Sequence, residues 1–182
     1  MKIAVMGAGS WGTTVAKVIA DGGNDVVLWS RRQDLADEIN ETSRNGDYLP
    51  GVDLPKALTA TSDLETALLD ATQIYIAIPS QSLRETLGQW KDLMPKGATV
   101  ISLMKGLEQS TGARMSEVIH QAANVPESQI AVLSGPNLAL EIARRDPAAA
   151  VCACEDQDRA IEVARVCSNQ YFTVFTNQDL VG

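Results

Sequence analysis

Apolar residues along the chain alternate between short runs that are typical of buried strands and longer segments with helical spacing. Residues 2–6 form the first apolar run, and residues 11–21 have a helical periodicity that two glycines end. Residues 25–29 form a second apolar run. The same alternation predicts further strands over 58–61, 74–78, 99–103, 130–133, 148–154 and 171–175, and further helices over 35–41, 64–69, 83–90, 115–123, 138–145 and 158–167.

Nearly continuous apolar strands that alternate with helices are typical of an α/β protein whose parallel sheet is covered on both faces. Right-handed connections between successive strands then give a doubly wound, Rossmann-type sheet, mostly parallel and with helices on both faces. Residues 1–182 contain no repeat of fixed period, no low-complexity segment and no internal linker, so we expect one domain. The chain stops soon after its last predicted strand, which indicates a fragment of a longer protein.

The segment between the first strand and the first helix has the glycine spacing of a dinucleotide-binding turn, Gly-Ala-Gly-Ser-Trp-Gly over residues 7–12. Gly7 permits the tight turn, Gly9 lets a pyrophosphate approach the backbone, and Gly12 lets the helix pack closely on the strand. The amides and the positive helix end around Ser10 and Trp11 then bind the anion. The alternative is a strand-to-helix turn that merely tolerates glycine, but the flanking strand and helix favour the dinucleotide site.

The end of the second strand distinguishes NAD from NADP, because NAD sites usually offer an acidic side chain there to the ribose 2′-hydroxyl. Here the sequence continues with Ser30, Arg31 and Arg32, and no carboxylate stands at that position. A guanidinium can pair with a 2′-phosphate and stack on adenine. We therefore expect NADP(H) to be preferred, with NAD(H) as the second cofactor. The alternative is that the two arginines form a solvated turn.

Composition and charge narrow the classes of partner. The 182 residues are 45% hydrophobic and 21% charged, as in ordinary globular domains, and a net charge of −8 argues against a nucleic-acid partner. No apolar run reaches the roughly 18 residues of a membrane span, so we expect no membrane insertion. Three cysteines without a secretory signal favour reduced thiols in the cytoplasm, and no second ligand pair completes a metal site around Cys152 and Cys154. We expect His120 to be a helix-surface residue.

From the glycine turn onward, the sequence resembles the NAD(P)-dependent glycerol-3-phosphate dehydrogenases of bacterial type. The matching segments follow the family's order along essentially the whole chain. They are Tyr-Leu-Pro-Gly at 48–51, Ile-Pro-Ser-Gln at 78–81 with Arg84, Lys-Gly-Leu-Glu at 105–108, Ser-Gly-Pro-Asn-Leu-Ala at 134–139 with Glu141, and the positions Asn177, Asp179 and Gly182. No single segment is decisive, but the ordered set is fairly specific.

The resemblance implies reversible hydride transfer between NAD(P)H and dihydroxyacetone phosphate, which gives sn-glycerol 3-phosphate for glycerophospholipid synthesis. It also implies roles for individual residues. The residues expected to contact the dinucleotide are Ser10, Trp11, Arg31, Arg32, Tyr48, Lys105 and Ala139. The residues expected to contact the substrate are Lys105, Gly135 and Asn137. Pro79 ends its predicted strand where it can aim the following backbone at the nicotinamide, although ordinary strand termination explains it equally well.

Two departures from the family pattern bear on these assignments. The family often has Ser-Phe where this chain has Asn137 and Leu138, and an asparagine still offers a donor and an acceptor. The family's general acid/base lysine and its phosphate-binding Arg-Asn pair lie in a helical second domain, which we expect after residue 182. Lys105 is then an electrostatic partner of the substrate oxygen, and taken alone it would pass for a surface turn. We therefore expect residues 1–182 to be inactive alone.

Two rival hypotheses stay open from the sequence. One is another two-domain NADP-dependent dehydrogenase, of the hydroxyacid or ketopantoate type, which would share the glycine turn but not the later Lys-Gly and Ser-Gly-Pro segments. The other is a dinucleotide-binding module without catalysis. On the family hypothesis the full-length protein acts on a small-molecule substrate in the cytoplasm, and a homodimer of it is allowed.

Overall fold

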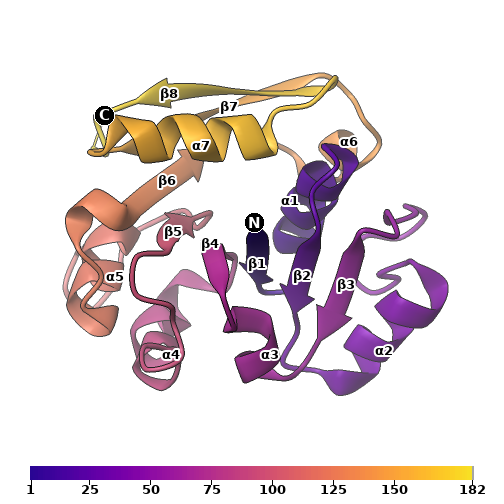
Figure 1. The fold of residues 1–182 in the computed structure, drawn as a ribbon, viewed down its shortest axis with the longest axis horizontal. Helices are drawn as coiled ribbons and strands as arrows, with labels where there is room; N and C mark the ends of the chain where they lie inside the picture. The colour runs from indigo at the N-terminus through magenta and orange to yellow at the C-terminus, as the bar shows by residue number, and fades with distance from the viewer. Residues whose placement is uncertain (182) are drawn as a thin grey trace.

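A computed structural model describes residues 1–181, so Gly182, which carries part of the resemblance, lies outside the described residues. Within them the chain forms eight strands, seven α-helices and two short 3-10 helices (Figure 1). In chain order they are β1 (Lys2–Met6), α1 (Ser10–Asp21), β2 (Val26–Trp29), α2 (Gln33–Thr42), β3 (Leu58–Thr61), α3 (Leu64–Leu68), β4 (Ala71–Ile76), η1 (Ser80–Ser82), α4 (Leu83–Trp90), β5 (Thr99–Ser102), α5 (Met115–Ala123), η2 (Glu127–Gln129), β6 (Ile130–Ser134), α6 (Ala139–Ala143), β7 (Ala148–Cys154), α7 (Gln157–Cys167) and β8 (Phe172–Asn177).

All eight strands belong to one sheet, in the order β3-β2-β1-β4-β5-β6-β7-β8. The chain adds β2 and β3 on one side of β1, and then continues from β4 on the other side, with β1 to β6 all parallel. The predicted doubly wound, mostly parallel sheet is confirmed. The order reverses between β1 and β4, and ligands in open α/β sheets bind in the crevice at the carboxyl ends of the two strands at such a reversal.

Alternate residues of β1 face two separate cores. Ile3 and Val5 belong to the core that packs under α1, α2, α6 and α7, whereas Ala4 and Met6 belong to the core under α3, α4 and α5. Figure 1 shows α1 and α7 on the side of the sheet opposite to α3 and α4. Because side chains of a strand point alternately to its two faces, the apolar run Ile3–Met6 of β1 is what a sheet covered on both faces requires.

The parallel pattern breaks at β7, which pairs with β6 in the antiparallel direction, while β8 then runs parallel to β7. The connection before β7 is shorter than we expected. We predicted a helix over 138–145, but α6 covers only five of those residues. Arg145 follows with a left-handed φ of 70°, and the chain turns back directly into β7.

The strand predicted over 74–78 is displaced, because β4 spans Ala71–Ile76. The apolar pattern missed the first three residues of the strand, 71–73. Gln73 is polar but almost fully buried, and it accepts a hydrogen bond from the Tyr75 hydroxyl at 2.6 Å. Residues 77 and 78 continue instead into the crevice beside β1. Ala77 still donates its amide to the Met6 carbonyl at 2.9 Å, so this segment is fixed against the end of β1.

A buried charge cluster joins the end of α1 to the antiparallel part of the fold. The Asp21 carboxylate accepts from Lys17 at 2.5 Å, from the Tyr171 hydroxyl at 2.7 Å and from Arg145 at 3.0 Å. Burial of the carboxylate raises its pKa, but the hydrogen bonds from these three side chains outweigh it and hold the Asp21 pKa below 3.8. The Lys17 side chain is itself only 4% exposed, so Asp21 is its necessary counter-charge.

Replacing Asp21 by asparagine should lower the free energy of unfolding by about 3 kcal/mol at neutral pH, because it leaves the buried Lys17 ammonium unpaired. Since the folded-state pKa of Asp21 lies below its ordinary value, its stabilisation is complete above pH 3.8 and is lost as the pH falls through the folded-state pKa. Urea unfolding of both proteins measures the difference.

Tyr171→Phe is the matched control, because it removes one hydrogen bond to the same carboxylate and should cost about 1 kcal/mol. Equal stability of Asp21→Asn and the unchanged protein at pH 7 would contradict the importance of this cluster.

Candidate functional site

Two glycines of the predicted turn are required by close contacts. Gly7 has a φ of +125°, and a Cβ there would lie 2.5 Å from the Ala77 carbonyl oxygen. A Cβ on Gly12 would lie 1.9 Å from the Gly7 carbonyl oxygen. Helix α1 therefore starts directly against the end of β1, and neither position accepts a side chain.

The middle glycine has a different environment. Gly9 is the N-cap of α1, its φ of −73° is open to any residue, and a Cβ there would meet no atom within 4 Å. The cap provides no side-chain acceptor, and the first turn of α1 contains no acidic residue. The first amides of α1 thus face open space at the positive end of the helix, which suits an anion such as a pyrophosphate.

A cavity of about 330 Å³ joins this turn to the ends of β2 and β4. It brings together the predicted residues Gly7, Gly9, Arg31, Arg32, Tyr48 and Pro79. Residues to which the sequence analysis assigned no contact complete the wall: Ala8, Trp29, Ser30, Leu35, Ala77, Ile78, Ser82 and Thr86. Ser82 and Thr86 carry no motif, and only the packing of η1 and α4 beside the crevice brings them here.

Ser10 and Trp11 do not line this cavity. The Ser10 hydroxyl donates to the Tyr48 carbonyl at 2.6 Å, and Trp11 packs partly buried against the core under α1. Their backbone amides remain part of the open helix end, since the hydroxyl and the indole point elsewhere.

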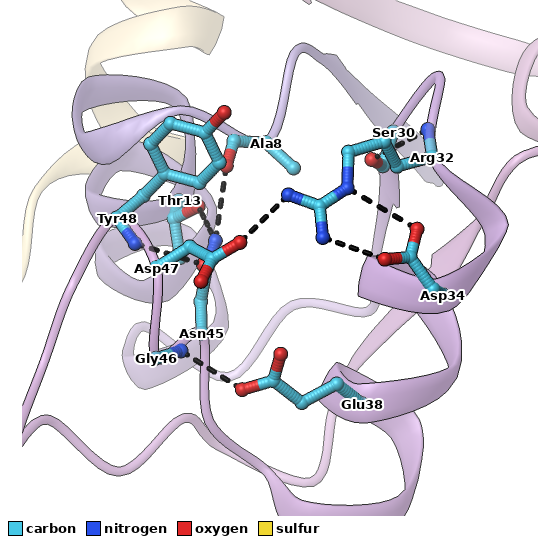
Figure 2. A network of polar contacts seen from close by, with 10 residues as sticks. All are labelled: Ala8, Thr13, Ser30, Arg32, Asp34, Glu38, Asn45, Gly46, Asp47 and Tyr48. Atoms are coloured by element: carbon cyan, nitrogen blue, oxygen red, sulfur yellow. Dashed lines mark hydrogen bonds and ion pairs between the residues drawn. The ribbon is translucent and has the colours of Figure 1, made fainter.

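The loop at 45–48 is fastened to the glycine turn by a fully buried asparagine (Figure 2). The Asn45 side-chain amide donates to the Ala8 carbonyl at 2.9 Å and to the Thr13 hydroxyl at 2.8 Å, and its oxygen accepts from the Tyr48 amide at 3.2 Å. No sequence motif singles out Asn45. Its buried role depends on a partner more than thirty residues away, which a local pattern does not reveal.

The two arginines after β2 differ sharply in their surroundings. Arg32 donates through Nε and Nη2 to both oxygens of Asp34, at 3.1 and 2.6 Å, and through Nη1 to Asp47 at 2.6 Å. Hydrogen bonds to Asp34, and then to Asp47, raise the pKa of Arg32 further above its ordinary value. Arg31 is exposed and, within residues 1–181, makes no hydrogen bond or ion pair. Arg31 is thus the uncommitted cation at the cavity.

The loop that carries Lys105 is tied both to the cavity and to the next strand. The Gln81 side chain donates to the Leu107 carbonyl at 2.9 Å and accepts from the Gln109 amide at 3.0 Å, so the segment after Pro79 holds the Lys105 loop. Lys105 itself donates to the Gly135 carbonyl at 3.1 Å. Lys105 and Gly135, which the resemblance assigns to one substrate, are therefore in contact.

An ion pair fixes the far end of the same loop. Arg84 donates to both carboxylate oxygens of Glu108 at 2.8 Å, and the Thr111 hydroxyl donates to Glu108 at 2.5 Å. These hydrogen bonds, from Arg84 first and then from Thr111, lower the pKa of Glu108 to about 2. The carboxylate stays charged at neutral pH and joins α4 to the Lys105 loop.

A second cavity of about 410 Å³ lies beyond the end of β6 and includes Gly135 and Asn137. A Cβ on Gly135 would lie 2.9 Å from the Ala149 carbonyl oxygen, so the backbones of β7 and this segment approach closely. The side-chain nitrogen Nδ2 of Asn137 is buried and has no hydrogen-bond partner among the described residues. Ala139 lines neither cavity, and its carbonyl accepts from the Thr14 hydroxyl of α1 at 3.2 Å.

The remaining candidate groups lie apart from both cavities. His120 Nδ1 is 2.8 Å from the Val125 carbonyl at the end of α5, and Cys152, Cys154 and Cys167 are buried thiols. Burial raises the pKa of both Cys152 and Cys167 to about 12, so neither is a thiolate at neutral pH. Residues 1–181 hold no group of three side chains suited to a metal ion, and every helix among them is too short or too polar to cross a membrane.

The two structural glycines give a direct test of the turn. Gly12→Ala should lower the free energy of unfolding by about 3 kcal/mol or more, because the new methyl group overlaps the Gly7 carbonyl. Gly9→Ala, which enters open space, should cost less than about 1 kcal/mol. Thermal unfolding of the two variants measures both losses of stability. Equal losses for Gly12→Ala and Gly9→Ala would contradict the close approach of α1 to β1.

Comparison with known proteins agrees with this geometry. Residues 2–160 match the family model described as the N-terminus of NAD-dependent glycerol-3-phosphate dehydrogenase. A protein of Corynebacterium kroppenstedtii named glycerol-3-phosphate dehydrogenase (NAD(P)+) is 54% identical over 180 residues, which is 99% of this chain and 54% of that protein. The crystal structure of glycerol-3-phosphate dehydrogenase from Coxiella burnetii superimposes with a TM-score of 0.90 at 34% identity, over 98% of this chain and 54% of that one.

Two further points follow from these matches. The chain spans about half the length of the relatives that it matches. A ketopantoate reductase of the PanE/ApbA family from Ralstonia eutropha shares only the fold, with 18% identity and a TM-score of 0.70. The rival hypothesis of a ketopantoate-type enzyme is therefore wrong for this chain.

Proposed function

This chain belongs to the NAD-dependent glycerol-3-phosphate dehydrogenase family, and on that premise we propose that it is the cofactor-binding half of such an enzyme. The whole protein would interconvert dihydroxyacetone phosphate and sn-glycerol 3-phosphate by hydride transfer with NAD(P)H, in the cytoplasm, and so supply glycerophospholipid synthesis. One observation carries the proposal. The uncapped end of α1 opens into a cavity that also contains Arg31 and Pro79, at the reversal of strand order.

The residues along the cavity suit successive parts of a dinucleotide. The open space at Gly9, which a larger side chain would occupy, suits the pyrophosphate against the first amides of α1. Arg31, Arg32 and Tyr48 would then surround the adenosine ribose, and Pro79 would lie toward the nicotinamide. The bound cofactor would supply the hydride, and the protein's part is to hold and orient it.

Preference for NADP(H) over NAD(H) follows from the charges at the end of β2. Arg32 donates to both carboxylate oxygens of Asp34 and to one oxygen of Asp47, so it engages both carboxylates near this position. The Arg31 guanidinium is uncommitted and can take a 2′-phosphate through two parallel hydrogen bonds. NAD(H) remains the weaker ligand.

On the substrate side, Lys105, Gly135 and Asn137 are the candidates. Lys105 would stabilise the substrate oxygen as negative charge develops on it, and it donates to the carbonyl of Gly135, a residue that lines the cavity beyond β6. The unpartnered Asn137 amide could donate to the same small molecule. The proton donor is expected from a lysine of the second domain after residue 182, and the full-length enzyme is compatible with a homodimer.

Arg31→Ala should raise the Kd for NADPH about tenfold or more, because it removes a charge-assisted contact to the 2′-phosphate. The Kd for NADH should change little. Fluorescence titration of both dinucleotides measures the two constants. Arg44→Ala is the matched control, since Arg44 is an exposed arginine paired with Asp53 and does not line the cavity. Equal weakening of both dinucleotides by Arg31→Ala would contradict the assignment.

Residues 1–182 should bind NADPH without using it to reduce dihydroxyacetone phosphate, because the expected proton donor lies outside them. An absorbance assay of NADPH consumption, with dihydroxyacetone phosphate added to the NADPH-bound chain, tests this. Robust turnover by this chain alone would refute the proposal that the proton donor lies in a second domain. NADPH binding without turnover in the full-length protein as well would favour the hypothesis of a non-catalytic module.

A further inference from the structure

The guanidinium of Arg32 is occupied on both of its sides (Figure 2). Asp34, in the first turn of α2, accepts hydrogen bonds from Nε and Nη2. Asp47, in the loop at 45–48, accepts one from Nη1. Arg31 completes the local set of charges, so two guanidiniums stand against two carboxylates. The net local charge is therefore zero.

A 2′-phosphate that enters this cavity meets the two carboxylates unequally. Asp34 binds Arg32 through two parallel hydrogen bonds, the stronger geometry, and follows it by two residues in the chain. Asp47 makes one hydrogen bond to Arg32 where Asp34 makes two. Of the two bonds, the one from Nη1 to Asp47 is the one that a phosphate oxygen can replace.

The loop does not depend on Asp47 for its position. Asn45 bonds it to Ala8 and Thr13, Glu38 accepts from the Gly46 amide at 3.0 Å, and Ser10 donates to the Tyr48 carbonyl. Removal of the Asp47 charge should therefore leave the loop in place. The effect on ligand binding can then be separated from an effect on folding.

We propose that Asp47 is a specificity-determining residue, which competes with the cofactor's 2′-phosphate for Nη1 of Arg32 and so limits the preference for NADP(H) over NAD(H). The inference rests on the proposed function, because it requires that a dinucleotide bind in this cavity. Asp47 acts in two ways. It withholds one donor of Arg32, and its own charge repels the dianionic phosphate. NAD(H), which carries a hydroxyl at this position, feels neither effect strongly.

The test is Asp47→Asn in the full chain, with NADPH and NADH titrated by fluorescence. The Kd for NADPH should fall about fivefold, and the Kd for NADH should change less than about twofold, because only NADPH carries the additional charge. The gain should shrink at high salt, where charge interactions at exposed sites are screened. As simpler probes, 2′,5′-ADP should bind more tightly to the variant, and 5′-ADP should bind equally to both proteins.

Asp53→Asn is the matched control. It also removes one negative charge and one bond to an arginine, at 2.7 Å from Arg44, but Arg44 does not line the cavity, whereas Arg32, the partner of Asp47, does. The ratio of the two Kd values should stay unchanged there. Asp47→Ser replaces the carboxylate by a shorter, uncharged side chain, and it should also lower the Kd for NADPH. Circular dichroism checks that each variant is folded.

Weaker NADPH binding by Asp47→Asn, or a Kd ratio no different from that of Asp53→Asn, would overturn the inference. If the unchanged chain binds both dinucleotides, such a result removes only the role of Asp47. If the unchanged chain binds neither, the proposed function fails together with the inference.

Discussion

The contact between helix α1 and the glycine turn is the constraint on which the cofactor site depends. Because Gly12 lies against the carbonyl of Gly7, and Gly7 against the carbonyl of Ala77, the helix begins at the very end of β1 and beside the end of β4. Its first amides therefore open into the crevice where the strand order reverses. The same packing gives the site its rigidity, since all three segments are backbone in contact with backbone.

Charged residues around this crevice serve two distinct purposes. Glu108 and Arg84 hold the loop of Lys105 in place, and their strong mutual pairing keeps them charged but unavailable to a ligand. Arg31 is available, and Arg32 is only partly so because of its two carboxylate partners. The site therefore combines fixed pairs that position a backbone segment with one uncommitted cation that can meet an incoming phosphate.

Sequence patterns predicted the sheet and the glycine turn correctly, because both depend on the local spacing of apolar residues and glycines. The alternation of apolar runs places β1, β2 and the glycines correctly, and the family resemblance finds Lys105 and Gly135, which prove to be in contact. The strand at 148–154 was predicted with the bounds of β7, but its antiparallel pairing with β6 was not, because the apolar pattern of a strand does not contain its direction in the sheet. Asn45 and Asp47 were also missed. Their hydrogen-bond partners, Ala8 for Asn45 and Arg32 for Asp47, are distant in the sequence, so the local spacing of residues does not predict these contacts.

The central claim is that main-chain amides at the start of α1 bind the diphosphate of the cofactor. The most direct measurement is a titration of the isotope-labelled chain by NMR, with amide resonances followed as NADPH and then adenosine are added. The account predicts that the amides of residues 9–12 shift saturably with NADPH and stay unchanged with adenosine, which lacks the diphosphate. NADPH binding that leaves those four amides unmoved would contradict it.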